Sequence, residues 1–112
     1  MRLTTNFYLI FFALLSFSFS VHAAGRLDVP RNVRATDGWH TDKISISWNA
    51  VSGATHYQIF RATSANASSA QPISGWITEP RFDDVQASAN TTYYYYVKAA
   101  QSATGSNATA LS

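Results

Sequence analysis

The segment at residues 91–99 constrains the fold of this chain more than any other part of the sequence. It reads TTYYYYVKA, and β-branched and aromatic residues of this kind favour a pleated sheet. The alternation of side chains along a strand would send Tyr93, Tyr95 and Val97 to one face and Tyr94 and Tyr96 to the other. The sequence therefore predicts a central strand here, and a strand requires partners.

Further short strands are predicted before and after this segment. Residues 43–48 (KISISW) alternate, with Trp48 on the apolar face, and residues 55–62 (THYQIFRA) resume the period of two, with Tyr57 and Ile59 on one face. Weaker strands are expected at residues 32–36, 72–77, 81–85 and 106–111. No helical period accompanies them, and each one-sided strand must bury its apolar face. About seven such strands predict an all-β fold, a two-sheet antiparallel β-sandwich.

The N-terminal residues form a separate unit. Residues 1–6 carry Arg2 and no acidic residue, residues 7–19 are apolar apart from two serines, and residues 21–23 (VHA) end in a small side chain. This pattern indicates a secretory signal peptide at residues 1–23, followed by one domain at residues 24–112. A membrane anchor is the alternative, but the apolar run is shorter than the roughly 20 residues that cross a bilayer. We therefore predict a secreted or periplasmic protein without stable membrane insertion.

Charge and cysteine content restrict the function classes. Cleavage would remove Arg2, one of eight basic residues, and leave a nearly neutral domain with six acidic residues. Because lysine and arginine do not cluster in the sequence, neither nucleic acid nor anionic lipid is expected as a partner. The chain has no cysteine, which excludes disulfides, thiol catalysis, cysteine metal sites and a lipid-modified cysteine anchor.

The sequence offers no arrangement of residues for catalysis. Asp83 and Asp84 are adjacent, so a strand would send the two carboxylates to opposite faces. Asp37, His40 and Asp42 are too few and too loosely spaced for a zinc or calcium site. No nucleophile beside a base can be nominated. We therefore predict a non-enzymatic protein without a cofactor or a metal.

The strand residues also carry a family pattern. In chain order it comprises Pro30-x-x-Val33-x-Ala35 followed by Asp37-Gly38, then Ile44-x-Ile46-x-Trp48, Gly53-Ala54-x-x-Tyr57-x-Ile59-x-Arg61, Phe82-Asp83 and Thr91-x-Tyr93-x-Tyr95-x-Val97-x-Ala99. With these motifs in this order, residues 24–112 resemble a fibronectin type III domain of the kind common in exported bacterial proteins. The resemblance implies an immunoglobulin-like sandwich. Its first, second and fifth strands form one sheet, and the strands of Tyr57, Tyr95 and the C-terminus form the other.

The resemblance also implies structural roles for the aromatic residues. Trp48 would be the core tryptophan. Tyr93 would be the tyrosine corner, whose ring packs inside and whose hydroxyl bonds to the backbone upstream. The predicted core comprises Trp48, Tyr57, Ile59, Tyr93, Tyr95 and Val97.

The last predicted strand is thin for this family, because residues 105–112 (GSNATALS) contain few apolar side chains. One expectation is that it still closes the edge of the sheet beside Tyr93, which predicts a monomer. The alternative is that this edge is a template for a strand from another chain. The protein would then be an N-terminal piece of a larger secreted protein, or part of a strand-exchanged assembly.

The side chains that alternate away from the predicted core form a candidate binding face. Cross-strand stacking would explain them through sheet stability alone, whereas tyrosines also suit a protein or polysaccharide partner. The leading hypothesis is an exported protein-interaction or spacer module that binds through this face. The alternative is a carbohydrate-binding module of a secreted or cell-surface system. The candidate binding residues are Phe60, Tyr94, Tyr96, His56, Gln58 and Trp76.

Overall fold

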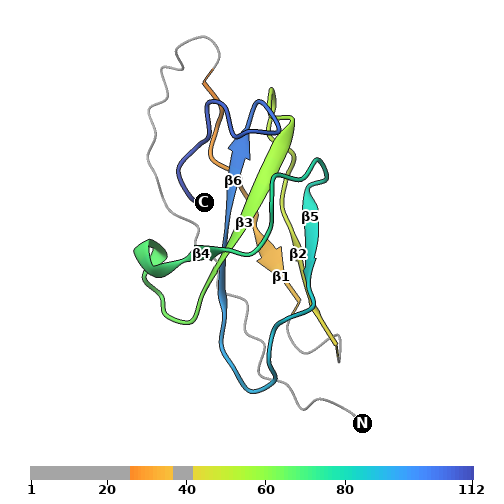
Figure 1. Cartoon of the computed structure of the whole chain (residues 1–112), viewed down its shortest axis with the longest axis vertical. Helices are drawn as coiled ribbons and strands as arrows, with labels where there is room; N and C mark the ends of the chain where they lie inside the picture. The colour runs from red at the N-terminus through yellow and green to blue at the C-terminus, as the bar shows by residue number, and fades with distance from the viewer. Residues whose placement is uncertain (1–25, 37–41) are drawn as a thin grey trace.

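Two antiparallel sheets packed face to face make up the computed structural model, which describes residues 26–36 and 42–112 (Figure 1). One sheet has the order β1-β2-β5, with β1 at Arg34–Ala35, β2 at Ile44–Ser47 and β5 at Arg81–Asp84. The other has the order β4-β3-β6, with β4 at Gln71–Pro72, β3 at His56–Ala62 and β6 at Tyr94–Ala100. The predicted all-β, two-sheet sandwich is confirmed, with six strands in the described ranges.

Some predictions concern residues outside this description. The signal peptide at residues 1–23, its cleavage site, Asp37 and His40 all lie outside the described residues. Within residues 26–36 and 42–112, no helix is long and apolar enough to span a membrane. A short 3-10 turn, η1 (Ala67–Ser69), lies in the polar loop between β3 and β4. Asn66 caps it by accepting a hydrogen bond from the backbone N–H of Ser68 at 3.1 Å.

The core lies between the two sheets and follows from the alternation of the strands. In β2, Ile44 and Ile46 are each 1% exposed, while Ser45 and Ser47 face away from the core. Trp48, just beyond β2, packs edge-on against a tyrosine of β3, with ring centroids 5.4 Å apart. The predicted core residues are all buried: Trp48, Tyr57, Ile59, Tyr93, Tyr95 and Val97.

Two core tyrosines use their hydroxyl groups to accept hydrogen bonds from backbone N–H groups. Tyr93 accepts from the N–H of Ser88 at 2.9 Å, and the turn between these residues contains Asn90 in the left-handed region, with a φ of 59°. This is the contact that the resemblance implied for a tyrosine corner. Tyr57 accepts from the N–H of Val51, also at 2.9 Å. Both bonds satisfy polar groups that would be costly to bury without a partner.

The edge strand beside β3 is short and interrupted. Pro72 pairs with Phe60 but has no N–H to donate to a ladder. The chain then departs from regular pairing, and the hydroxyl of Ser74 accepts the backbone N–H of Ile59 at 3.0 Å. An isolated bridge between Ile77 and Tyr57 resumes the contact. The strand predicted at residues 72–77 is therefore present as two brief contacts along β3.

The C-terminal segment closes part of the free edge of β6 without being a strand, so the strand predicted at residues 106–111 is wrong as secondary structure. Thr109 and Ser112 donate backbone N–H groups to the carbonyls of Ala99 at 2.9 Å and Val97 at 3.1 Å. In return, the N–H groups of Ala99 and Val97 donate to the side-chain hydroxyls of Thr109 at 3.1 Å and Ser112 at 2.9 Å. Hydroxyl acceptors stand where a ladder would use carbonyls, because short hydroxyl side chains compete with regular backbone pairing.

The substitution Thr109→Val tests this closure. Valine keeps the shape of threonine but removes the hydroxyl, so the buried N–H of Ala99 loses its acceptor, and we expect the free energy of unfolding to fall by about 1–3 kcal/mol. Chemical denaturation measures the loss, and faster hydrogen exchange at the Ala99 amide would locate it. Thr63→Val, at an exposed threonine, is the matched control. Equal stability of the two variants would contradict the role of the Thr109 hydroxyl.

Candidate functional site

The outer face of β3 and β6 carries most of the predicted binding residues. Phe60 pairs with Tyr96, and Gln58 lies on the same face of β3. His56 lies at the start of β3 and Tyr94 at the start of β6, so the two residues occupy opposite ends of this face. Trp76 lies between β4 and the bridge at Ile77. We call the following residues the aromatic face: Phe60, Tyr94, Tyr96, His56, Gln58 and Trp76.

Tyr96 is buried, which corrects the prediction that its side chain is free for binding. It is 1% exposed, and its hydroxyl donates to the carbonyl oxygen of Ala65, in the loop after β3, at 3.4 Å. Burial raises the pKa of Tyr96, and the neighbouring Tyr94 adds to this rise. Strand alternation determines the face on which a side chain lies but not what covers that face. The sequence pattern therefore could not show that Tyr96 is enclosed.

The remaining strand residues of the aromatic face are half-buried and hold defined contacts. The ammonium of Lys98 lies 5.2 Å from the centroid of the Phe60 ring, which is a cation–π contact. The side-chain amide of Gln58 donates to the carbonyl of Ser74 at 3.1 Å. The partly accessible side chains of this surface are His56, Gln58, Phe60, Tyr94 and Lys98.

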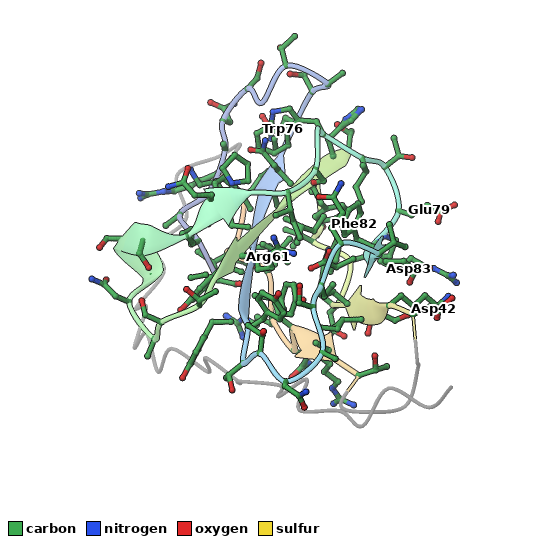
Figure 2. The ribbon with its side chains drawn as sticks, turned by 60° about the horizontal axis from the view of Figure 1, so that its bottom comes forward. Asp42, Arg61, Trp76, Glu79, Phe82 and Asp83 are labelled. Carbon is green, nitrogen blue, oxygen red and sulfur yellow. The ribbon has the colours of Figure 1, made fainter. Side chains whose placement is uncertain are left out.

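Trp76 is held against the turn that precedes the C-terminal segment. Gly105 has a φ of 85°, and a Cβ at this position would lie 2.7 Å from Cζ2 of Trp76. Only glycine meets both the backbone conformation and the close approach of the ring. Figure 2 shows Trp76 near one end of the molecule and Arg61 near its centre. The half-buried indole ring is therefore positioned by a backbone contact.

A largely buried charged cluster, which the sequence analysis did not single out, joins the two sheets. Oδ2 of Asp84 on β5 accepts hydrogen bonds from the guanidinium of Arg61 on β3 at 2.7 Å and from the hydroxyl of Tyr95 on β6 at 2.9 Å. Oδ1 accepts from the backbone N–H of Gln86 at 3.1 Å. The guanidinium also lies 4.8 Å from the centroid of the Tyr93 ring. We call Arg61, Asp84 and Tyr95 the inter-sheet cluster.

The sequence contains a signal for this cluster. Arg61 alternates with Tyr57 and Ile59 on β3, so its charge falls on the core face of the strand. A buried charge is rarely found without a partner of opposite sign. An inward-facing acid on the opposite sheet is therefore required, and Asp84, 3% exposed, supplies it.

The environment of the cluster favours the protonation states that its hydrogen bonds need. Burial, with the nearby charge of Asp84, raises the pKa of Tyr95 far above its usual range. Burial alone would lower the pKa of Arg61, but its hydrogen bond to Asp84 and the charge of that carboxylate outweigh this effect and raise the pKa. Tyr95 therefore stays a hydrogen-bond donor and Arg61 stays charged. Together they tie β3 and β6 to β5.

Asp83 faces away from the cluster, so the prediction that the adjacent carboxylates lie on opposite faces is confirmed. Its two oxygens accept hydrogen bonds from the hydroxyl of Ser45 at 2.7 Å and the ammonium of Lys43 at 3.1 Å. The bond from Ser45 lowers the pKa of Asp83, and Lys43 lowers it further. Figure 2 shows Asp83 at the margin of the molecule, away from Arg61. The two carboxylates do not meet in a common site.

Comparisons with known proteins bear on the fold. No protein-family model matches the sequence, and no curated protein matches it. Among solved structures, a Fn3-like protein from Clostridium thermocellum is similar, with a TM-score of 0.66 and 26% identity over 75% of this chain and 83% of that chain. The fold is fibronectin type III-like. A second similar structure is the pectate lyase PelI from Erwinia chrysanthemi, in complex with tetragalacturonic acid. Its TM-score is 0.55, with 19% identity over 75% of this chain and 27% of the lyase. This similarity concerns the fold alone.

The substitution Asp84→Asn tests the inter-sheet cluster. It leaves the guanidinium of Arg61, whose side chain is 23% exposed, without its counter-charge, so the loss should lie near the lower end of the range of about 3–5 kcal/mol of unfolding free energy that breaking a buried ion pair costs. Asp83→Asn is the control, because it makes the same chemical change at the adjacent residue, whose side chain is 36% exposed, and it should cost no more than about 1 kcal/mol. Chemical denaturation of both variants measures the difference. Similar losses would show that the cluster does not hold the sheets together.

Proposed function

We propose that this protein is an exported, non-catalytic, fibronectin type III-like module that binds a partner protein through the accessible part of the aromatic face. That part is formed by Phe60 and Tyr94, with His56 and Lys98 beside them. Tyr96 does not belong to it, because its side chain is enclosed. The N-terminal pattern of residues 1–23 supports export.

The observation that carries the proposal is the contact between Phe60 and Lys98 outside the core. The two side chains lie on neighbouring strands, and the ammonium stands 5.2 Å from the centre of the ring. A cross-strand pair of this kind adds only about 0.2–1 kcal/mol to the stability of a sheet. The pair also presents apolar area and positive charge together on an accessible face. Aromatic residues are enriched in protein interfaces for this reason.

The inter-sheet cluster supports a non-catalytic role. Arg61, Asp84 and Tyr95 donate to and accept from one another inside the sandwich. These groups are therefore committed to packing the sheets. A scaffold held in this way leaves its outer faces for contact with partners.

A double variant, Phe60→Ser with Tyr94→Ser, tests the proposal. The affinity-tagged protein should recover a partner from the envelope fraction of the native host, and the double variant should recover it at least about tenfold less well, since aromatic anchors carry much of the energy of an interface. Val85→Ser is the control, because Val85 is the large hydrophobic residue that the described part of the chain exposes most, at 69%. Undiminished recovery by a double variant that unfolds at the wild-type temperature would overturn the site assignment.

Carbohydrate binding is the second candidate function, and Trp76 favours it. The backbone at Gly105 fixes the indole ring on one side, and the ring stays half-buried at the edge of the sheet. A rigid, partly accessible aromatic ring is the platform on which a sugar ring can stack. Tyr96 cannot serve as a second platform, because its side chain is enclosed.

Retention on insoluble polysaccharide tests this second function. If Trp76 is the platform, the wild-type protein should be retained on a column of cellulose or chitin and Trp76→Ala should elute in the void. The Phe60→Ser, Tyr94→Ser variant should still be retained, because those residues belong to the protein-binding proposal. If the wild-type protein is retained on neither material, the hypothesis of carbohydrate binding is wrong.

A further inference from the structure

The outer face of the β1-β2-β5 sheet brings together two arginines that are far apart in the sequence. The strand register places Arg34 of β1 opposite Ser47 of β2, and Ser47 opposite Arg81 of β5. All three side chains are exposed, and their strand neighbours Ala35 and Ile46 are buried. Adjacent strands lie about 4.8 Å apart, so the backbones that carry the two arginines are about 10 Å apart. We call Arg34, Ser47 and Arg81 the arginine row.

The arginine row has donors that the protein itself does not use. Among the residues that the structure describes, Arg34, Ser47 and Arg81 have no side-chain hydrogen bond or ion pair, although the charge of Arg81 lies close enough to Asp83 to help lower the pKa of that carboxyl. Their side chains offer two guanidinium forks and one hydroxyl along a line across the strands. Nothing in the sandwich requires two arginines at these positions, because like charges on one sheet face do not stabilise it.

In the next row on the same face, the side chains are hydrogen-bonded within the protein. The hydroxyl of Thr36 accepts the backbone N–H of Ser45 at 3.0 Å, and the hydroxyl of Ser45 donates to Asp83 at 2.7 Å. Lys43, just before β2, forms an ion pair with the same carboxylate at 3.1 Å. One row is therefore hydrogen-bonded within the protein, whereas, within the described part of the chain, the guanidiniums of the arginine row make no side-chain hydrogen bond and Arg81 has only a longer-range attraction to Asp83. The unsatisfied donors belong to the arginine row and not to the sheet face in general.

We propose that the arginine row binds an acidic polysaccharide through its carboxylate groups. A guanidinium matches a carboxylate in a bidentate pair, and two arginines on either side of a serine can hold two carboxylates of one chain that lies across the strands. The hydroxyl of Ser47 lies between them and can bond to a sugar hydroxyl. This surface is on the other sheet from the aromatic face, so the inference stands independently of the proposed protein-binding site.

Surface composition favours a polysaccharide over a protein as the occupant. Protein interfaces are built around buried apolar anchors. On this face the row and its neighbours are charged or hydroxyl side chains, and the exposed large hydrophobic residue of the described part, Val85, lies beyond β5 in the following turn. A hydrophilic polymer with charges needs no apolar anchor. The row therefore suits a carboxylated sugar chain better than a folded partner.

The acidic residues near the row argue against nucleic acid. Figure 2 shows Asp42, Asp83 and Glu79 along the side of the molecule formed by this sheet. DNA carries a phosphate at every 3.4 Å of each strand, so some phosphates would meet these carboxylates. A chain with one carboxylate per sugar has a lower charge density and can place its charges at the two arginines. Because the face carries both arginines and carboxylates, it favours a ligand with more widely spaced negative charges than those of DNA.

Affinity electrophoresis of the purified protein tests the inference, with alginate as the polyuronate probe. We expect retardation by alginate at low salt, no retardation by neutral amylose, and weaker binding as salt is raised. Arg34→Ser with Arg81→Ser should weaken alginate binding at least about tenfold, because each lost pair is a hydrogen-bonded charge contact. Arg26→Ser with Arg31→Ser removes the same charge from two exposed arginines outside the row and is the matched control. Thermal unfolding of both double variants verifies that each is folded.

Several outcomes would overturn the inference. If alginate does not retard the protein, an acidic polysaccharide is not its ligand. The same conclusion follows if the protein binds polyglutamate or double-stranded DNA more tightly than alginate. If the two double variants lose alginate affinity equally, the arginine row is not the binding site, because the effect then follows net charge alone. The aromatic-face variant Phe60→Ser, Tyr94→Ser should bind alginate as the wild type does. The arginine-row variant should likewise keep any protein partner of the aromatic face, so that each proposal can fail without the other.

Discussion

The pairing of β3 with β6 is the interaction on which the rest of this structure depends. The two strands pair along their full length, from His56 opposite Ala100 to Ala62 opposite Tyr94. This register places Arg61 beside Tyr95 on the core face, where both reach Asp84 of the other sheet. The outward side chains of the same strands form the aromatic face. One pairing thus organises the link between the sheets and a candidate contact surface.

The two sheets show their outer faces to solvent in different ways. The outer face of β3 and β6 is partly closed, because the loop after β3 reaches Tyr96 and the edge segment at Ser74 contacts Gln58. The outer face of the β1-β2-β5 sheet is polar and open, with Arg34, Ser47 and Arg81 exposed. A sandwich whose two sheets bury their inner faces against each other can therefore offer two outer surfaces of different chemistry. The first is the surface proposed for a protein partner, and the second is the surface proposed for an anionic polysaccharide.

Edge protection in this protein relies on side chains as much as on strands. Hydroxyls of Thr109 and Ser112 accept the N–H groups of Ala99 and Val97, so the C-terminal segment covers part of the edge of β6 without a regular ladder. On the other edge, Pro72 ends the pairing of β4 and Ser74 accepts the N–H of Ile59. Short edges with few free donors are a common means of avoiding pairing with other chains. These contacts favour a closed sheet along the pairs that they cover.

The sequence by itself determined the long strands, their inward faces and the sandwich, because alternation with a period of two reports which side chains can share a core; the C-terminal strand that it predicted at residues 106–111 is absent. It placed Trp48, Tyr57, Tyr93 and Tyr95 inside, where the structure has them. Tertiary structure alone decided that Tyr96 is enclosed and that Arg34 and Arg81 share one row. Alternation carries no information on what covers a face or on which strands become neighbours. Cross-strand neighbours depend on the register between segments distant in the chain, and that register is set only when the sheets form.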